Sequence, residues 1–195
     1  MNQGNQLELD RCPHCNVAKP LLGRVWHFET TDHAKENKRA WSTYACKSCG
    51  GIVLVVSPSD INHHIISMWP APQVVADEVP SRAREFLSQA ISSLHAPAGA
   101  VMLTASAVDA MLKDKGYKEG SLNSRIDAAA KSHLITEEMS AWAHEIRLDA
   151  NDQRHADELA ALPTAADAEK VIEFASALAQ FIYVLPARVA RGRKP

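Results

Sequence analysis

Hydrophobic and polar residues alternate in short runs over the first third of the chain. Three runs rich in β-branched and aromatic side chains cover residues 21–28, 40–45 and 51–56, and such runs are typical of β-strands. The polar stretch from Thr30 to Arg39 separates the first two runs and is most simply a loop. The pattern therefore predicts a small β-rich domain over residues 1–57.

Prolines punctuate the segment 58–80, where they occupy positions 58, 70, 72 and 80. The same segment also contains the apolar side chains of Ile65, Ile66 and Trp69. Because proline interrupts regular secondary structure, we expect a linker that lies against one domain through its apolar residues.

From residue 81 onward, apolar residues recur every three or four positions, which predicts amphipathic helices. Candidate N-terminal caps precede four of these helices: Ser81, Ser121, Thr136 and Thr164. Asp167 follows Thr164 by three residues and completes a capping box. A bundle of five helices is expected over residues 81–187, with helices at 81–94, 97–116, 121–133, after residue 136 and from residue 164.

The composition excludes several classes of protein. Of the 195 residues, 46% are hydrophobic and 23% are charged, which is ordinary for a soluble globular protein and unlike a disordered or fibrous one. The longest apolar runs are far shorter than the ~20 residues that span a bilayer. Residues 1–10 also lack the apolar core of a signal peptide. We therefore expect a cytoplasmic protein that has no membrane partner.

The formal net charge is −2, but the charges are unevenly distributed. Residues 58–187 contain ten basic and eighteen acidic side chains, and an acidic body disfavours a broad phosphate-binding face. Any nucleic acid must therefore be contacted locally. Residues 188–195 are expected to form a solvated basic tail, which contains Arg188, Arg191, Arg193 and Lys194.

Two Cys-x-x-Cys pairs contain all the cysteines of the chain, Cys12, Cys15, Cys46 and Cys49. Two intervening residues let a tight turn direct both sulfurs to one ion, and four thiolates complete the tetrahedral shell of structural zinc. No ligand position is left for water, so the predicted metal is structural and compensates for the small core of a domain of about fifty residues.

The identity of the predicted metal follows from the ligand set. Four thiolates in a short β-rich domain favour Zn²⁺ in a zinc ribbon, and a rubredoxin-type iron is the alternative. His14 and His33 are alternative ligands, but the four cysteines already fill the shell. We expect both histidines to be exposed to solvent.

The fourth predicted helix carries two lines of side chains. A core-facing stripe is formed by Met139, Trp142, Ile146 and Ala150. A second, polar line is formed by Arg147, Asn151 and His155, which are spaced four apart. The simplest interpretation of this line is a solvated face with ion pairs among neighbouring charges, and a functional site is the alternative.

The stretch from about Trp69 to Leu185, and above all the segment 146–155, resembles the bacterial family called domain of unknown function 4145. The features that carry the resemblance are Trp69-Pro70, Ile146-Arg147, Asn151, His155 and the Thr164-x-x-Asp167 helix start. That family in turn resembles the HEPN helical bundles (higher eukaryotes and prokaryotes nucleotide-binding). The resemblance implies an α+β chain, in which an all-α HEPN-like bundle follows the zinc ribbon.

The resemblance also implies roles for individual residues. Many HEPN proteins are metal-independent ribonucleases of toxin, restriction and phage-defence systems, and two subunits meet at the motif. His155 would then transfer a proton at a ribose 2′-hydroxyl or at the leaving oxygen. Arg147 would stabilise charge on the phosphoryl oxygens, and Asn151 would orient a phosphate or the partner subunit. Asp109 is the candidate for a supporting acidic role.

Two functional hypotheses follow. The first is a non-catalytic, dimeric HEPN-like adaptor or nucleic-acid- or nucleotide-binding module in phage defence or stress, with RNA or protein as its partner. The second is a metal-independent endoribonuclease that acts through Arg147 and His155. A DNA-binding regulator is a third hypothesis, which is weaker because no predicted helix carries a basic recognition face.

Overall fold

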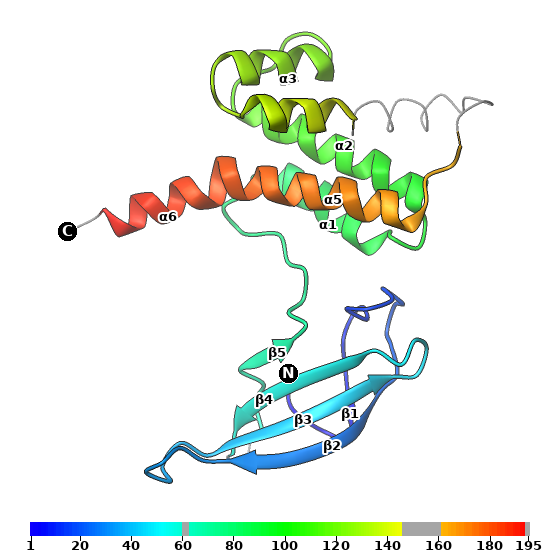
Figure 1. The fold of residues 1–195 in the computed structure, drawn as a ribbon, viewed down its shortest axis with the longest axis vertical. Helices are drawn as coiled ribbons and strands as arrows, with labels where there is room; N and C mark the ends of the chain where they lie inside the picture. Colours follow the sequence, from blue (N-terminus) through cyan, green and yellow to red (C-terminus); the bar gives the residue numbers. More distant parts are fainter. Residues whose placement is uncertain (60–62, 146–160, 194–195) are drawn as a thin grey trace. The chain divides into compact units, whose positions relative to one another are not determined.

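The computed structural model describes residues 1–59, 63–145 and 161–193. The chain forms two compact units, an N-terminal unit Met1–Gln73 and a C-terminal unit Val74–Pro195 (Figure 1). The first contains a β-sheet and the second contains helices, so the α+β class expected from the sequence is confirmed.

The N-terminal unit is built on a five-stranded antiparallel sheet in which the strand order follows the chain order. The strands are β1 (Gln6–Leu7), β2 (Leu22–Thr30), β3 (Arg39–Cys46), β4 (Ile52–Pro58) and β5 (Ser67–Trp69). The three predicted strands and the loop between β2 and β3 are confirmed. The sheet also has two short edge strands that the sequence pattern did not predict.

The extra strand β5 changes the boundary expected at residue 57. Its residues Ser67–Trp69 pair with Leu54 to Val56 of β4, so part of the proline-marked segment belongs to the sheet. Val79, near the end of that segment, is buried in the core of the C-terminal unit instead. The segment 58–80 is thus divided between two cores. Its apolar residues pack against the core of the unit that lies next to them in the chain.

One face of the sheet supports the core of the N-terminal unit. Strand residues alternate between faces, and the buried side chains on the inner face include Tyr44 of β3 with Val53 and Val55 of β4. The cluster also includes Cys12 and Cys46, so the small apolar core extends to the cysteine pairs.

The C-terminal unit is helical throughout its regular structure. Its elements are α1 (Ser81–Ser92), α2 (Pro97–Asp114), α3 (Leu122–Lys131), a helical stretch at 137–145, α5 (Ala165–Ala179), the π-helical turn η1 (Gln180–Val184) and α6 (Leu185–Gly192). Figure 1 shows α5 and α6 as one continuous rod, with α1 and α2 beside α5. The five predicted helices are present in the described residues.

Most of the predicted helix starts have the expected side-chain caps. Ser121 caps α3, and Thr164 forms a reciprocal capping box with Asp167 at the start of α5. Thr136 accepts a hydrogen bond from the Met139 backbone N–H at 3.2 Å. The prediction for Ser81 was wrong, because Pro80 occupies the cap position and no side chain caps α1.

The end of the chain differs from the predicted tail. Residues up to Gly192 continue the last helix, and Arg191 forms an ion pair with Glu78 at 2.9 Å. The side chains of α6 are exposed or half-buried, as a solvated end requires. The ion pair of Arg191 with Glu78 holds the end of this helix against the segment before α1.

The continuous helix Ala165–Gly192 is long and apolar enough, by length and composition alone, to cross a membrane. Half of its most apolar window is buried among the other helices, and Phe174 within it contacts the edge of Trp142 at 4.9 Å between ring centroids. This pattern is consistent with the central helix of a soluble bundle.

Candidate functional site

The two cysteine pairs lie in turns of the same construction. The backbone N–H of Asn16 donates to the carbonyl of Cys12 at 3.0 Å, and that of Gly50 donates to the carbonyl of Cys46 at 2.8 Å. Asn16 and Gly50 both have positive φ, at 56° and 75°. Glycine and asparagine adopt this conformation most readily, which explains why these residues follow the two Cys-x-x-Cys pairs.

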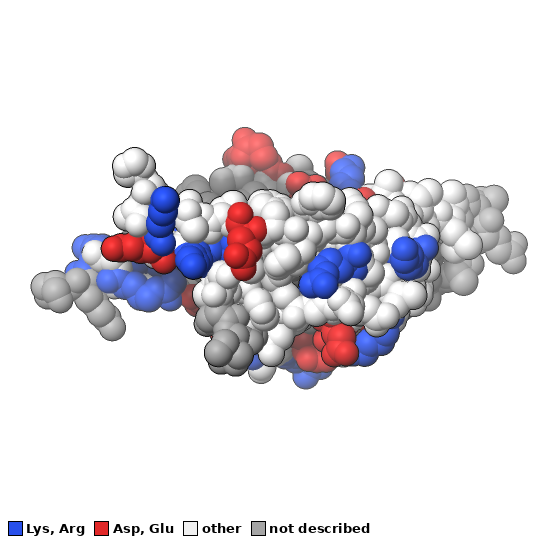
Figure 2. Space-filling model, turned by 90° about the horizontal axis from the view of Figure 1, so that it is seen from below, with Lys and Arg blue, Asp and Glu red and all other residues white. Residues whose placement is uncertain are grey.

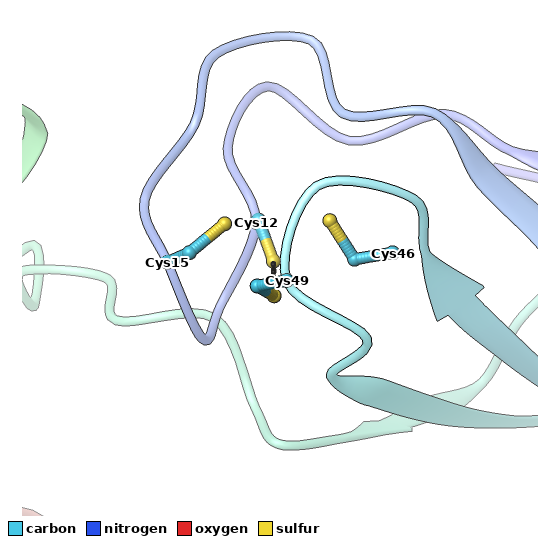
Figure 3. A group of neighbouring side chains, drawn as sticks. All are labelled: Cys12, Cys15, Cys46 and Cys49. Atoms are coloured by element: carbon cyan, nitrogen blue, oxygen red, sulfur yellow. Dashed lines mark hydrogen bonds between the residues drawn. The ribbon is translucent and has the colours of Figure 1, made fainter.

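The turns bring the four thiols of Cys12, Cys15, Cys46 and Cys49 together (Figure 3). All four sulfurs lie within 4.8 Å of one another, and the Sγ atoms of Cys12 and Cys49 are 3.9 Å apart. Zn–S bonds of about 2.3 Å in a tetrahedron place sulfurs about 3.8 Å apart. A disulfide needs sulfurs about 2.05 Å apart, so the arrangement suits a metal ion.

Backbone N–H groups face the sulfurs. His14 donates to the Sγ of Cys12 at 3.5 Å, and Gly51 donates to the Sγ of Cys49 at 3.4 Å. Such hydrogen bonds stabilise thiolate charge and would be retained around a bound cation. The four thiols therefore form a candidate metal centre of closed, all-sulfur type.

The pKa values of the thiols diverge in the cluster. Burial raises the pKa of Cys46, but backbone N–H groups of Cys49 and Ser48 and the neighbouring thiols outweigh burial and lower it to about 7. The N–H of Gly51 lowers the pKa of Cys49, yet desolvation and the three other thiols raise it to about 12. Burial raises the pKa of Cys12. Four thiols packed together without a cation cannot all ionise easily.

The alternative histidine ligands are placed elsewhere. The Nε2 atom of His14 lies 2.8 Å from the carbonyl oxygen of Ile52, and the imidazole packs directly over Gly51. His33 lies in the loop before β3, whereas Cys46 ends that strand, about 24 Å further along at the usual rise per residue. Both histidines are exposed, as expected.

Asp109 on α2 is the one candidate of the predicted catalytic set within the described residues. Its carboxylate accepts a hydrogen bond from Arg125 of α3 at 2.6 Å and pairs with Lys113 at 2.5 Å. The Arg125 side chain is only 11% exposed and also donates to the carbonyl of Lys118. Asp109 therefore joins α2 to α3 as part of an ion-pair network.

These charges line a groove of about 930 Å³ between the starts of α1 and α3 and the C-terminal half of α2. Arg125 was not predicted as a site residue from the sequence. It lies sixteen residues from Asp109 in the chain, and no local spacing marks their pairing. The buried side of α3, with Ile126 and Ala129 in the core, places Arg125 next to Asp109.

The predicted line Arg147, Asn151 and His155 lies outside the described residues. The described part of the same helix confirms the start of the core-facing stripe, since Met139 and Trp142 pack against the bundle core. On the polar side, the Nε2 atom of His144 lies 2.8 Å from the Asp127 carboxylate of α3. Polar side chains of this helix thus contact α3 before the candidate line begins.

The family called domain of unknown function (DUF4145) matches residues 88–194, just over half of the chain. The chain belongs to the DUF4145 family. The match begins within α1 and includes the remaining helices, so the DUF4145 domain corresponds to the helical part of the C-terminal unit. No curated protein and no solved structure matches the chain.

Proposed function

We propose that this DUF4145 protein is a zinc-stabilised, dimeric, non-catalytic adaptor of HEPN-like type that acts in phage defence or stress. In this proposal the N-terminal unit is a zinc ribbon that contacts a nucleic acid or protein partner. The C-terminal unit is a HEPN-like bundle that pairs with a second copy. The protein would act in the cytoplasm, where thiols stay reduced and available to a metal.

The proposed zinc is a structural ion held by Cys12, Cys15, Cys46 and Cys49. The separations of the sulfurs and the surrounding N–H groups fit a tetrahedral, all-thiolate shell. Bound there, zinc supplies a cross-link between the two cysteine turns and leaves no position for a catalytic water. The protein residues set the turns, and the metal fixes them to each other.

The pairing of Asp109 supports an adaptor over a nuclease. Both oxygens of its carboxylate are engaged, one by Arg125 and the other by Lys113. A carboxylate that acts in acid–base chemistry or orients a base needs access to a substrate or to a catalytic histidine. Here Arg125 ties α3 to α2 through this carboxylate, and Lys113 pairs with it from the same helix, which supports a structural role.

Exposed apolar residues support dimerisation. Phe181, Leu185 and Val189 are spaced four apart along the last helix and are 42%, 46% and 57% exposed. A row of large apolar side chains on one helix is the kind of surface that a two-fold contact buries, since each copy presents the same patch. The line Arg147, Asn151 and His155 is the second candidate for this contact.

The test compares wild-type protein with a His155→Ala variant on total RNA, in buffer with and without a chelator. The proposal predicts that neither protein cleaves RNA and that the wild type, with zinc retained, is a dimer by light scattering at micromolar concentration. A weakened dimer in His155→Ala would assign the contact to the line Arg147, Asn151 and His155. Metal-independent cleavage that disappears in His155→Ala would replace the adaptor with a ribonuclease using Arg147, Asn151 and His155. A monomeric wild-type protein would overturn the dimeric part of the proposal.

A further inference from the structure

Aromatic side chains form a row across the outer face of the N-terminal sheet. Phe28 of β2 lies directly opposite Trp41 of β3 in the strand register, with ring centroids 6.2 Å apart and ring planes 7° from parallel. Trp69 of β5 continues the row, 6.0 Å from Trp41 and inclined by 24°. Three strands thus contribute nearly parallel rings to one line.

The two ends of the row are exposed although they are large and apolar, and only the central Trp41 is half-buried. Phe28 is 41% and Trp69 is 47% exposed, and Trp26, which pairs with Thr43 on the same face, is 66% exposed. The indole N–H of Trp41 donates to the Thr30 hydroxyl at 2.9 Å, which fixes the central ring. We call Trp26, Phe28, Trp41 and Trp69 the aromatic face. An exposed apolar cluster of this kind is typical of a contact surface.

Charge on the aromatic face is sparse and positive. Among the described strand residues that alternate onto it, Arg39 is the only charged side chain, and it lies opposite Thr30 and Pro58. Glu29 alternates to the other face, where its carboxylate accepts from Ser59. In the view of Figure 2, basic and acidic side chains are interspersed with wide uncharged areas. Because Arg39 is the one cation among the described strand residues of the aromatic face, that face would attract phosphate only locally and weakly.

We propose that the aromatic face binds single-stranded nucleic acid by stacking bases on its rings. This inference rests on the proposed function and specifies the class of partner. Every base has a flat π surface, and successive aromatic side chains are the usual platform for unpaired bases. A duplex keeps these surfaces within its own stack. Arg39 supplies a contact for one phosphate beside the row.

The experiment uses the full-length, zinc-loaded protein and an eight-nucleotide oligothymidine strand. This DNA lacks the 2′-hydroxyl, so binding is measured separately from ribonuclease activity. Three of the four tryptophans belong to the aromatic face, and stacked bases should quench their fluorescence. Phe28→Ala and Trp69→Ala should each weaken binding about tenfold. Leu162→Ala, at an exposed apolar residue of the C-terminal unit that lies outside the row on the last helix, should leave binding unchanged.

Salt and duplex controls define the binding mode. With one or two phosphate contacts, affinity should fall by less than about tenfold between 50 and 200 mM salt. A longer GC-rich duplex, which stays fully paired at the assay temperature, should bind much more weakly. Zinc content and circular dichroism of each variant establish that the sheet has folded.

Several outcomes would overturn the inference. These are no quenching by the strand, a duplex that binds as tightly as the single strand, or equal losses of binding in Leu162→Ala and Phe28→Ala. Self-association that Phe28→Ala abolishes would assign the aromatic face to a protein partner instead. A failure of strand binding would leave the proposed function standing, because a dimer that does not cleave RNA supports the adaptor whether or not the strand binds.

Discussion

The guanidinium of Arg125 donates to the carboxylate of Asp109 at 2.6 Å and thereby joins α3 to α2. Arg125 is nearly buried, and its Nε–H has no hydrogen-bond partner among the described residues. Arg125 therefore depends on the Asp109 carboxylate to offset the cost of desolvating its guanidinium. The role of Asp109 can therefore be measured as a change in the free energy of unfolding.

Replacing Asp109 with Ala should destabilise the C-terminal unit by about 1–3 kcal/mol, because Arg125 would stay partly buried without its charged partner. Urea unfolding followed by the helical circular dichroism signal measures the loss. Replacing both Asp109 and Arg125 should cost less than the sum of the single changes. The control is Lys170→Ala, which removes an exposed pair with Glu145 at 3.7 Å and should change stability little. If Asp109→Ala and Lys170→Ala lowered the free energy of unfolding equally, the structural role of Asp109 would be contradicted.

Metal removal should affect the two units differently. Each chain is expected to bind one zinc ion, and Cys46→Ser should unfold the N-terminal unit, whose small core extends to that thiol. The helices should persist, because the C-terminal unit has a separate core. Elemental analysis and circular dichroism give the two readouts. Iron in place of zinc, or loss of the helical signal together with the metal, would refute this prediction.

The sequence revealed the parts of the molecule whose determinants are local. The Cys-x-x-Cys spacing identified the thiol cluster, and the capping box of Thr164 and Asp167 identified the start of α5 within one residue. The alternation of β-branched residues also located β2, β3 and β4. In each case neighbours within a few residues specify the structure, so a pattern is enough.

The features that were not predicted depend on contacts distant in the chain. Ser67–Trp69 form a strand only because the edge of β4 offers hydrogen bonds. The row Phe28, Trp41 and Trp69 requires the register of four strands, which no single run of residues specifies. Arg125 is paired through the packing of α3 on α2. Tertiary structure, and not local preference, determines all three.

Gly51→Ala should weaken metal binding through His14. A Cβ atom at position 51 would lie 2.8 Å from the Cβ of His14, which is close to the backbone and cannot move away by a change of rotamer. The first cysteine turn would have to shift, and the four sulfurs would no longer be arranged as a tetrahedron. Competition with a chromogenic chelator should show a lower zinc affinity.

The second cysteine turn, which contains Gly50, supplies a control for Gly51→Ala. Gly50→Asn should be tolerated, because Asn16 has positive φ at the equivalent position of the first turn and a side chain at Gly50 meets no atom within 4 Å. If Gly51→Ala retained the affinity of the wild type, the close packing of His14 on Gly51 would be wrong.

Asp167 should make the start of α5 sensitive to acid. Hydrogen bonds from the Thr164 hydroxyl and then from its backbone N–H lower the pKa of this carboxyl below its ordinary value. A carboxyl whose pKa is lower in the folded state contributes stability above its unfolded pKa of about 3.9, and the contribution is lost as the pH falls through the folded pKa. Thr164→Val removes the hydroxyl. The pKa of Asp167 should rise, and the stability difference between wild type and variant should shrink on acidification.

Carboxyl-carbon NMR titration measures the pKa of Asp167 directly and includes its own control. The pKa of Asp32 is also lowered, by the N–H of Glu36 and the side chain of Asn37, in a loop of the other unit. Thr164→Val should therefore leave the titration of Asp32 unchanged while it moves that of Asp167. An Asp167 that titrates at the ordinary value in the wild type would show that the capping box does not persist in solution. A shift of both residues would point to a global change in the fold and away from the local hydrogen bond.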